Sequence, residues 1–301
     1  MIYLTENLRN NIDGFNTVVF DVDGVLVDTS YSYTRAVLDA VSVYGTTILG
    51  YDWKPETFHY DQFKTVKGFN NDWDIAEALL LYYLQREILN KPMSFFTFLS
   101  ELTSNGKGMF NIISWINKGR NSGKGRLSEL YRKETIRQYA MELYAGTDRC
   151  KSFFGFDPVL SDCPGMVDNE TLIVNTDFLE KLNAVTAVYT GRNVYELTDI
   201  FNRIGYTGWK EEFCFCDDCS SPVKPDPEPL CTIADSSECT GIIFVGDSRD
   251  DFETGENFIQ SRPEVPFEFV QIMRQGSRFD CRHSALDDIN QLLYFLLGEI
   301  S

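Results

Sequence analysis

The sequence has little histidine, little positive charge and no long apolar run, and each shortage excludes a class of function. Its 301 residues include only two histidines, His59 and His283, which excludes a histidine-rich metal centre. With 27 Lys and Arg against 45 Asp and Glu, the formal net charge is −18. A chain this acidic repels nucleic-acid phosphates and anionic lipid headgroups, so we expect neither nucleic acid nor a membrane surface as its partner. No uninterrupted apolar segment reaches the about 18 residues that a membrane-spanning helix needs.

We expect neither a secretion signal nor a disulfide framework. Residues 1–7 show no basic region followed by an apolar run, so we expect no secretory leader. The eight cysteines are spread over a large chain, which favours a cytoplasmic protein with mostly reduced thiols. Cys214, Cys216 and Cys219 leave a zinc site open as an alternative, although their spacing is not that of paired Cys-x-x-Cys units.

Four short apolar segments end at polar residues and predict buried strands. They cover residues 16–20, 184–189, 241–245 and 267–273. Helical patterns lie between them at residues 194–204, 227–234 and 251–258. This alternation predicts an α/β fold with a Rossmann-like, doubly wound parallel sheet. Ligands of such sheets bind beyond the carboxyl ends of the strands, where the polar residues collect.

The region between residues 31 and 165 has a different pattern. It is helix-rich and aromatic, shows no clear buried strand, and predicts helices over 75–89 and 126–144. We therefore expect an inserted all-α domain at residues 31–165. The α/β core domain would then combine residues 1–30 with residues 166–301.

Carboxylates gather where two of the predicted strands end. Asp21 and Asp23 lie two residues apart just past the first strand, and Gly24 lets the backbone turn sharply after them. Asp247 and Asp251 follow another strand. At about 4 Å, two like charges repel by roughly 4 kcal/mol at an effective dielectric constant near 20. A hard divalent cation with oxygen ligands, most simply Mg²⁺, would relieve this repulsion.

Four motifs, taken in order, resemble those of the haloacid dehalogenase (HAD) superfamily. They are Asp21-Val22-Asp23-Gly24-Val25, Val188-Tyr189-Thr190-Gly191-Arg192, Val223-Lys224-Pro225-Asp226-Pro227 and Val245-Gly246-Asp247-Ser248-Arg249-Asp250-Asp251. Together they frame essentially the whole chain. The helical insertion falls where subfamily I members of this superfamily carry an α-helical cap domain.

The resemblance implies a reaction and roles for three aspartates. Asp21 would be the nucleophile that forms an aspartyl-phosphate, and Asp23 the general acid and then the general base. Mg²⁺ would be held by Asp21, the backbone carbonyl of Asp23 and Asp247. An acid at Asp23 favours phosphate esters over the halide and phosphonate substrates of other branches. The expected function is therefore Mg²⁺-dependent hydrolysis of a small organic phosphate monoester.

The same resemblance implies residues that bind the phosphate group. Thr190 would donate a hydrogen bond to it, and Lys224 would supply a cation for its developing charge. Gly191 and Arg192 complete the expected phosphate-binding loop, although Arg192 could equally cap local backbone. Asp251 is expected to orient Lys224 or a metal-bound water without binding the metal itself.

Three residues of the predicted cap are candidates for binding the organic part of the substrate. Asn70, Asn71 and Trp73 lie where a loop enters the helix predicted over 75–89, and they offer amide and aromatic groups. A structural interpretation stands beside this one, in which Asn71 only caps the helix and Trp73 only anchors a core.

Two other functions remain open at this point. A phosphomutase would use the same residues and return the phosphoryl group to the substrate. A non-catalytic binding protein on a HAD scaffold is the second alternative, which the complete set of motif residues disfavours. The sequence indicates neither the organic group of the substrate nor the oligomeric state.

Overall fold

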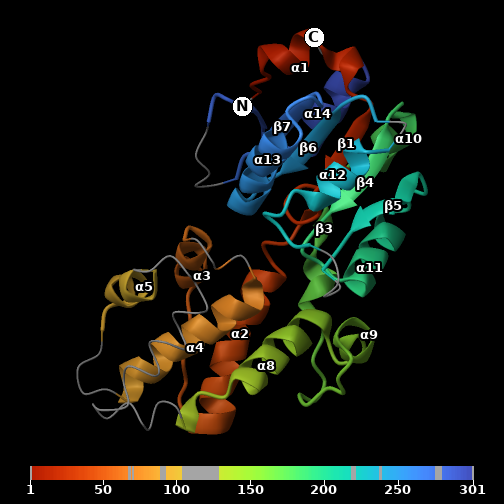
Figure 1. Cartoon of the computed structure of the whole chain (residues 1–301). Helices are drawn as coiled ribbons and strands as arrows, with labels where there is room; N and C mark the ends of the chain where they lie inside the picture. Colours follow the sequence, from red (N-terminus) through yellow and green to blue (C-terminus); the bar gives the residue numbers. More distant parts are fainter. Residues whose placement is uncertain are drawn as a thin grey trace. The chain divides into compact units, whose positions relative to one another are not determined.

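The computed structural model of the chain describes residues 2–66, 69, 71–88, 93–103, 129–217, 222–236, 239–274 and 280–299. The chain divides into two compact units (Figure 1). The core unit combines Met1–Asp28 with Thr171–Ser301, and the helical unit is Thr29–Glu170. The observed divisions thus fall after residues 28 and 170, compared with the domain boundaries expected after residues 30 and 165.

The core unit is built on a parallel sheet, in which the described residues form six strands. The strand order is β5-β4-β1-β6-β7-β8, and each neighbouring pair is parallel. The strands are β1 (Thr17–Phe20), β4 (Val185–Tyr189), β5 (Trp209–Phe215), β6 (Ile242–Gly246), β7 (Phe267–Ile272) and β8 (Ser284–Leu286). The chain starts at β1, builds outward to β5, and then returns to the other side of β1 to form β6. This topology confirms the predicted doubly wound α/β fold and creates a switch point beside β1.

Helices cover both faces of the sheet. Alternate residues of a strand point to opposite faces, so Val18 and Phe20 enter one hydrophobic cluster and Val19 enters another. The first cluster includes residues of α1 (Glu6–Asn10), α10 (Thr176–Lys181), α11 (Val194–Ile204) and α14 (Ile289–Leu296). The second includes residues of α12 (Glu228–Ala234) and α13 (Arg249–Ser261). Because both faces are buried, the central strands consist largely of consecutive apolar residues.

Short elements complete the core unit. The turn η1 (Ile12–Gly14) precedes β1. The strands β2 (Val27–Asp28) and β3 (Thr171–Leu172) pair in antiparallel orientation. They lie at the two points where the chain leaves and re-enters this unit.

The helical unit packs around an aromatic core. Its elements are α2 (Tyr33–Tyr44), η2 (Gly45–Leu49), α3 (Thr57–Lys64), α4 (Asp72–Ile88), α5 (Phe95–Thr103), α8 (Lys133–Ala145), α9 (Cys150–Phe154) and η3 (Met166–Asn169). Tyr33 of α2 stacks on Tyr144 of α8, with ring centroids 4.2 Å apart. The described part of this unit contains no strand, in agreement with the predicted all-α insertion. Across the described residues, no helix combines the length and the apolar character needed to cross a membrane.

One predicted helix begins later than expected. The prediction over 126–144 is wrong at its start, because residues 131–132 are not helical and α8 begins at Lys133; residues 126–128 lie outside the described residues. A tertiary contact explains the break. The Tyr44 hydroxyl donates to the Leu130 carbonyl (2.6 Å) and accepts from the Arg132 N–H (3.2 Å), which are backbone groups that a continuous helix would pair.

Candidate active site

The predicted catalytic residues follow three neighbouring strands of the sheet. Asp21 comes directly after β1, Thr190 directly after β4, and Asp247 directly after β6. These strands are adjacent and parallel, so their carboxyl ends meet at one edge of the sheet. Lys224 comes from the segment between β5 and α12, and Asp251 lies in the first turn of α13.

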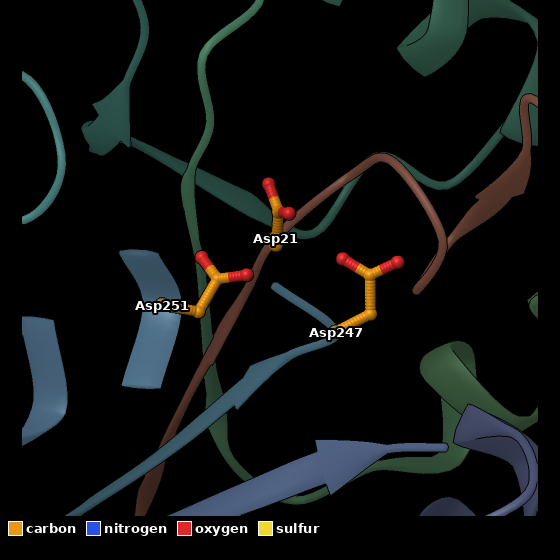
Figure 2. A group of neighbouring side chains, drawn as sticks. All are labelled: Asp21, Asp247 and Asp251. Atoms are coloured by element: carbon orange, nitrogen blue, oxygen red, sulfur yellow. The ribbon is translucent and has the colours of Figure 1, made fainter. Parts of the chain in front are cut away.

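Three carboxylates meet at this edge. Asp21, Asp247 and Asp251 each offer an oxygen atom, and these oxygens lie within 4.8 Å of one another. Figure 2 shows the three side chains, which come from the loops after β1 and β6 and from α13. Asp21 and Asp251 are buried, whereas Asp247 is partly exposed. The structure thus brings together Asp21 and Asp247, the two residues expected to share a cation.

Lys224 lies between two of these carboxylates. Its Nζ is 2.8 Å from Oδ1 of Asp21 and 2.5 Å from Oδ1 of Asp251, and its side chain is only 7% exposed. Burial alone would lower the pKa of Lys224, but the two carboxylates outweigh burial and raise that pKa above its usual value. The ammonium group is therefore a permanent positive charge beside Asp21.

Hydrogen bonds to the backbone fix the segment that carries Lys224. The Tyr189 hydroxyl donates to the Asp226 carbonyl (3.0 Å), and the Asn257 amide donates to the Pro225 carbonyl (2.9 Å). Both acceptors lie within two residues of Lys224. Sequence reasoning did not identify Tyr189 or Asn257, although a hydroxyl at the last position of an apolar strand was a visible signal for Tyr189.

Asp251 uses both of its oxygens within the protein. Oδ1 pairs with Lys224, and Oδ2 accepts from the Ser248 N–H (3.0 Å) and hydroxyl (2.6 Å). Ser248 in turn caps α13 by accepting the Asp251 N–H. This geometry suits Asp251 to holding Lys224 in place.

Asp23 pairs with Arg192. The Nε and Nη2 atoms of Arg192 both donate to Oδ1 of Asp23, at 2.9 Å and 2.7 Å. The Arg192 side chain is 1% exposed, while that of Asp23 is 36% exposed. Next to them, the buried Thr190 hydroxyl accepts the Arg192 N–H at 3.2 Å, and Gly191 is exposed. A direct contact of Arg192 with substrate stays a prediction.

An arginine that sequence reasoning missed also reaches the site. Arg274 follows β7, and its Nε lies 2.6 Å from Oδ2 of Asp247. It belongs to no recognised motif, and its only signal was a position beyond the carboxyl end of a predicted strand. Gly24 makes room for this pair. It adopts φ +78°, and a Cβ there would lie 2.1 Å from both Asp247 Oδ2 and Arg274 Nη2.

With this geometry in view, the comparisons with known proteins decide the family. Residues 15–258 match the model of a hydrolase family, described as haloacid dehalogenase-like hydrolase. The chain belongs to this HAD-like hydrolase family. A search of curated proteins gives no match.

Solved structures share the fold of this HAD-like hydrolase. The phosphatase Tt82 from Thermococcus thioreducens is 21% identical, with a TM-score of 0.69, covering 94% of this chain and 99% of Tt82. A candidate phosphoglycolate phosphatase from Lactobacillus delbrueckii subsp. bulgaricus is 15% identical, with a TM-score of 0.52, covering 94% of this chain and 99% of that one. At these identities the likeness is one of fold.

The acidic cluster of this HAD-like hydrolase fits a divalent cation. Burial raises the pKa of Asp21 well above its usual value, Lys224 lowers it, and the charges of Asp251, Asp23 and Asp247 raise it again. Burial also raises the pKa of Asp247 to about 7, against the opposing effect of its partner arginine. Burial and mutual repulsion thus disfavour the charged forms of these carboxylates, and a bound dication would favour them. Oxygen atoms are also the ligands that a hard dication prefers.

The predicted substrate-binding residues of the cap belong to the helical unit. Asn70 lies outside the described residues. Asn71 accepts the Trp73 N–H at 2.9 Å and so caps α4. The Trp73 ring packs against Tyr33, Tyr144 and Phe154, with centroids 5.7 to 5.9 Å apart. These contacts agree with the structural interpretation, and a role of Asn71 and Trp73 in substrate binding stays a prediction.

The three clustered cysteines give no added support for zinc. Cys214 lies in β5, Cys216 follows that strand, and Cys219 lies outside the described residues. Burial raises the pKa of Cys214 to about 12, which disfavours the thiolate that zinc requires.

Proposed function

We propose that this HAD-like hydrolase is a magnesium-dependent phosphatase that cleaves small organic phosphate monoesters through an aspartyl-phosphate on Asp21. The proposal rests on one observation: the buried Asp21 carboxylate pairs with the buried Lys224 ammonium inside an acidic cluster. Asp23 supplies a second carboxyl group two residues away. A nucleophile, a fixed cation and an acid are what phosphoryl transfer from an oxygen ester requires.

In the first proposed step, the phosphoryl group moves from the substrate to Asp21. A carboxylate oxygen of Asp21 bonds to phosphorus while the bond from phosphorus to the ester oxygen breaks. The leaving oxygen keeps the electron pair and takes a proton from the Asp23 carboxyl group. The Lys224 ammonium and the Thr190 hydroxyl stabilise the charge on the phosphoryl oxygens.

In the second proposed step, water releases the phosphate. The Asp23 carboxylate accepts a proton from the water as its oxygen bonds to phosphorus. The bond between phosphorus and Asp21 breaks, which regenerates the Asp21 carboxylate and gives inorganic phosphate. Asp23 ends protonated, ready for the next cycle.

The contact with Arg192 suggests which oxygen of Asp23 moves the proton. The Nε and Nη2 groups of Arg192 both donate to Oδ1 of Asp23. We therefore assign proton transfer to Oδ2. Because the guanidinium group is always charged, it also stabilises the carboxylate that remains after the leaving group has been protonated.

The proposed metal ligands are Asp21, Asp247 and the backbone carbonyl of Asp23. When bound, Mg²⁺ supplies the positive charge that lets a carboxylate approach an anionic phosphate. We do not assign Asp251 as a ligand, because its Oδ1 already forms an ion pair with Lys224 and its Oδ2 accepts from Ser248.

Several features support this substrate class. Tt82, which shares the fold, is named a phosphatase. A net charge of −18 disfavours nucleic acids as substrates, so we propose small cytoplasmic phosphate esters. We assign the helical unit the role of a cap that selects the organic group.

Phosphate release from a panel of sugar, nucleotide, amino-alcohol and cofactor phosphates tests the function. The protein should release phosphate from at least one of them in the presence of Mg²⁺ and lose this activity with a chelator. Asp21→Asn should abolish turnover, because an amide cannot serve as the nucleophile. Asp13→Asn makes the same substitution at an exposed position in η1 and should leave turnover unchanged.

Two outcomes would replace the proposal. Isomerised product without free phosphate would identify a phosphomutase. Binding of phosphate esters without turnover, and with equal affinity in wild type and Asp21→Asn, would identify a binding protein on a HAD scaffold.

A further inference from the structure

The cations at the candidate active site differ in how firmly they are held. The side chains of Lys224 and Arg192 are 7% and 1% exposed, so the surrounding protein keeps both cations from moving into water. Arg274 is 35% exposed and its partner Asp247 is 17% exposed. Arg274 is thus the cation of this group that can move into water at the smallest cost.

Arg274 also lies where an incoming cation would meet it. Its Nε is 2.6 Å from Oδ2 of Asp247, a proposed metal ligand. Its Nη2 lies over the Gly24 turn, directly after the proposed acid Asp23. A guanidinium group cannot give up its charge. A dication bound by Asp247 would therefore repel Arg274 if the arginine stayed in place.

We propose that Arg274 is an exchangeable counter-ion, which balances Asp247 in the metal-free protein and releases it when a divalent cation binds. This inference rests on the proposed function, since it takes Mg²⁺ as the cation. Arg274 is in this sense a positioning residue, because it acts on the reaction through Asp247.

A second conceivable role of Arg274, orienting Asp247 for metal binding, predicts the opposite change in Mg²⁺ affinity. If Arg274 instead held Asp247 in the orientation needed to bind metal, its removal would weaken metal binding. If the two cations compete for Asp247, its removal must strengthen metal binding. The sign of the change in Mg²⁺ affinity therefore separates the two roles without any measurement of turnover.

The test is calorimetric titration of MgCl₂ into wild type, Arg274→Gln and Arg203→Gln at constant ionic strength. Arg203 is a matched control in α11, because its side chain is 27% exposed and pairs with Asp199. Arg274→Gln should lower the Kd for Mg²⁺ by about fivefold or more, the range of ordinary coupling between two ligands. Arg203→Gln should change it far less, since it removes the same charge at a remote position.

Thermal unfolding gives a second readout. Without Mg²⁺, Arg274→Gln should melt below Arg203→Gln, because Asp247 has lost its counter-ion. Saturating Mg²⁺ should raise the melting temperature of Arg274→Gln more than that of wild type. An equal or smaller rise would overturn the exchange.

A wild-type experiment covers the case in which Arg274→Gln does not fold. The ¹⁵Nε–H signal of Arg274, assigned by its absence in Arg274→Lys, should shift and exchange faster with water as Mg²⁺ is added. An unchanged signal at saturation, or weaker Mg²⁺ binding by Arg274→Gln, would refute the inference while leaving the proposed function intact. If wild type bound no Mg²⁺ at all, the metal of the proposed function would fail, and this inference with it.

Discussion

Asp21 and Asp23 are chemically identical and two residues apart, yet they have opposite surroundings. Asp21 is buried against Lys224, whereas the Asp23 side chain is 36% exposed and accepts twice from Arg192 through one oxygen. The first environment fixes a carboxylate in position, and the second leaves a carboxyl group access to water. This division matches the roles proposed for them, nucleophile and proton carrier.

Replacing Asp23 should slow the reaction in a way that depends on the leaving group. Asp23→Asn should reduce the hydrolysis of an alkyl phosphate by about 10²- to 10⁴-fold, because a basic alkoxide needs a proton as it leaves. For an aryl phosphate with an acidic phenol, the rate of aspartyl-phosphate formation should fall much less. Rapid-quench kinetics measures this rate. Mg²⁺ affinity should persist, since the proposed ligand is the backbone carbonyl of Asp23. Equal losses for both esters would contradict the acid role.

Removing the charge of Lys224 should damage both folding and catalysis. Lys224→Gln leaves Asp21 and Asp251 buried without their ammonium partner, which should lower the free energy of unfolding by ~3–5 kcal/mol. Urea denaturation of Lys224→Gln and of the exposed control Lys181→Gln measures the difference. A loss of stability no larger than that of the control would show that Lys224 is not the counter-ion of these carboxylates.

Individual elements could be predicted where local signals are strong. The helix α11 spans the expected residues 194–204, because Asn193 and Glu196 form a capping box across its first turn and Gly205 ends it at φ 74°. The strands β1, β4, β6 and β7 were predicted within one residue at each end, since most residues of each strand are apolar and most are buried. The start of α8 was missed because the Tyr44 contact that breaks the helix is distant in sequence.

The edge strand β8 was not predicted at all, and it is held by tertiary contacts. Its three residues carry no strand pattern, but the buried Glu268 carboxylate on β7 accepts from the Ser284 hydroxyl at 2.7 Å. Glu268 also accepts from Thr5 (2.7 Å) and Asn7 (3.0 Å) near the N-terminus. One buried acid thus joins the start of the chain to two strands of the sheet.

Glu268 should therefore matter for stability and not for the reaction. Glu268→Ala leaves donor groups of three residues, Thr5, Asn7 and Ser284, without their acceptor and should lower the free energy of unfolding by roughly 2–4 kcal/mol. Glu264→Ala, an exposed acid just before β7, is the control and should change it little. Turnover at a temperature where both variants are folded should match wild type. A lower kcat for Glu268→Ala under those conditions would argue against a purely structural role.

At the scale of the whole molecule, the sequence predicts the class of fold and the aspartates that meet at the candidate site, but not the full electrostatics of that site. Asp21 and Asp247 could be identified because each lies in a short motif beside a strand end, and Lys224 because it lies in a motif of its own. Arg274 could not, because only the fold brings a residue after β7 to the loop after β6. The organic group of the substrate cannot be predicted from the sequence either, because the described contacts of Asn71 cap a helix and those of Trp73 pack helices together.

The pH dependence of folding involves both units, because each contains one of the two histidines. Burial lowers the pKa of His59 and of His283, and nearby glutamates oppose it only in part. A histidine with a lowered pKa in the folded state binds fewer protons than it does in the unfolded chain. Its contribution to stability is therefore complete above about pH 6.5 and declines as the pH falls through its folded pKa.

The double variant His59→Gln/His283→Gln isolates this effect. Buried carboxylates with raised pKa values instead add stability as the pH falls. Wild type and the double variant share these carboxylates, so their effect cancels in the difference in stability between the two proteins. Wild type should be the more stable protein at pH 7.5, and its advantage in urea denaturation should shrink steadily towards pH 5. The single variants should each show part of the change, since the histidines lie in different units. An advantage that stays constant or grows as the pH falls would mean that the histidines are no less protonated in the folded protein than in the unfolded chain.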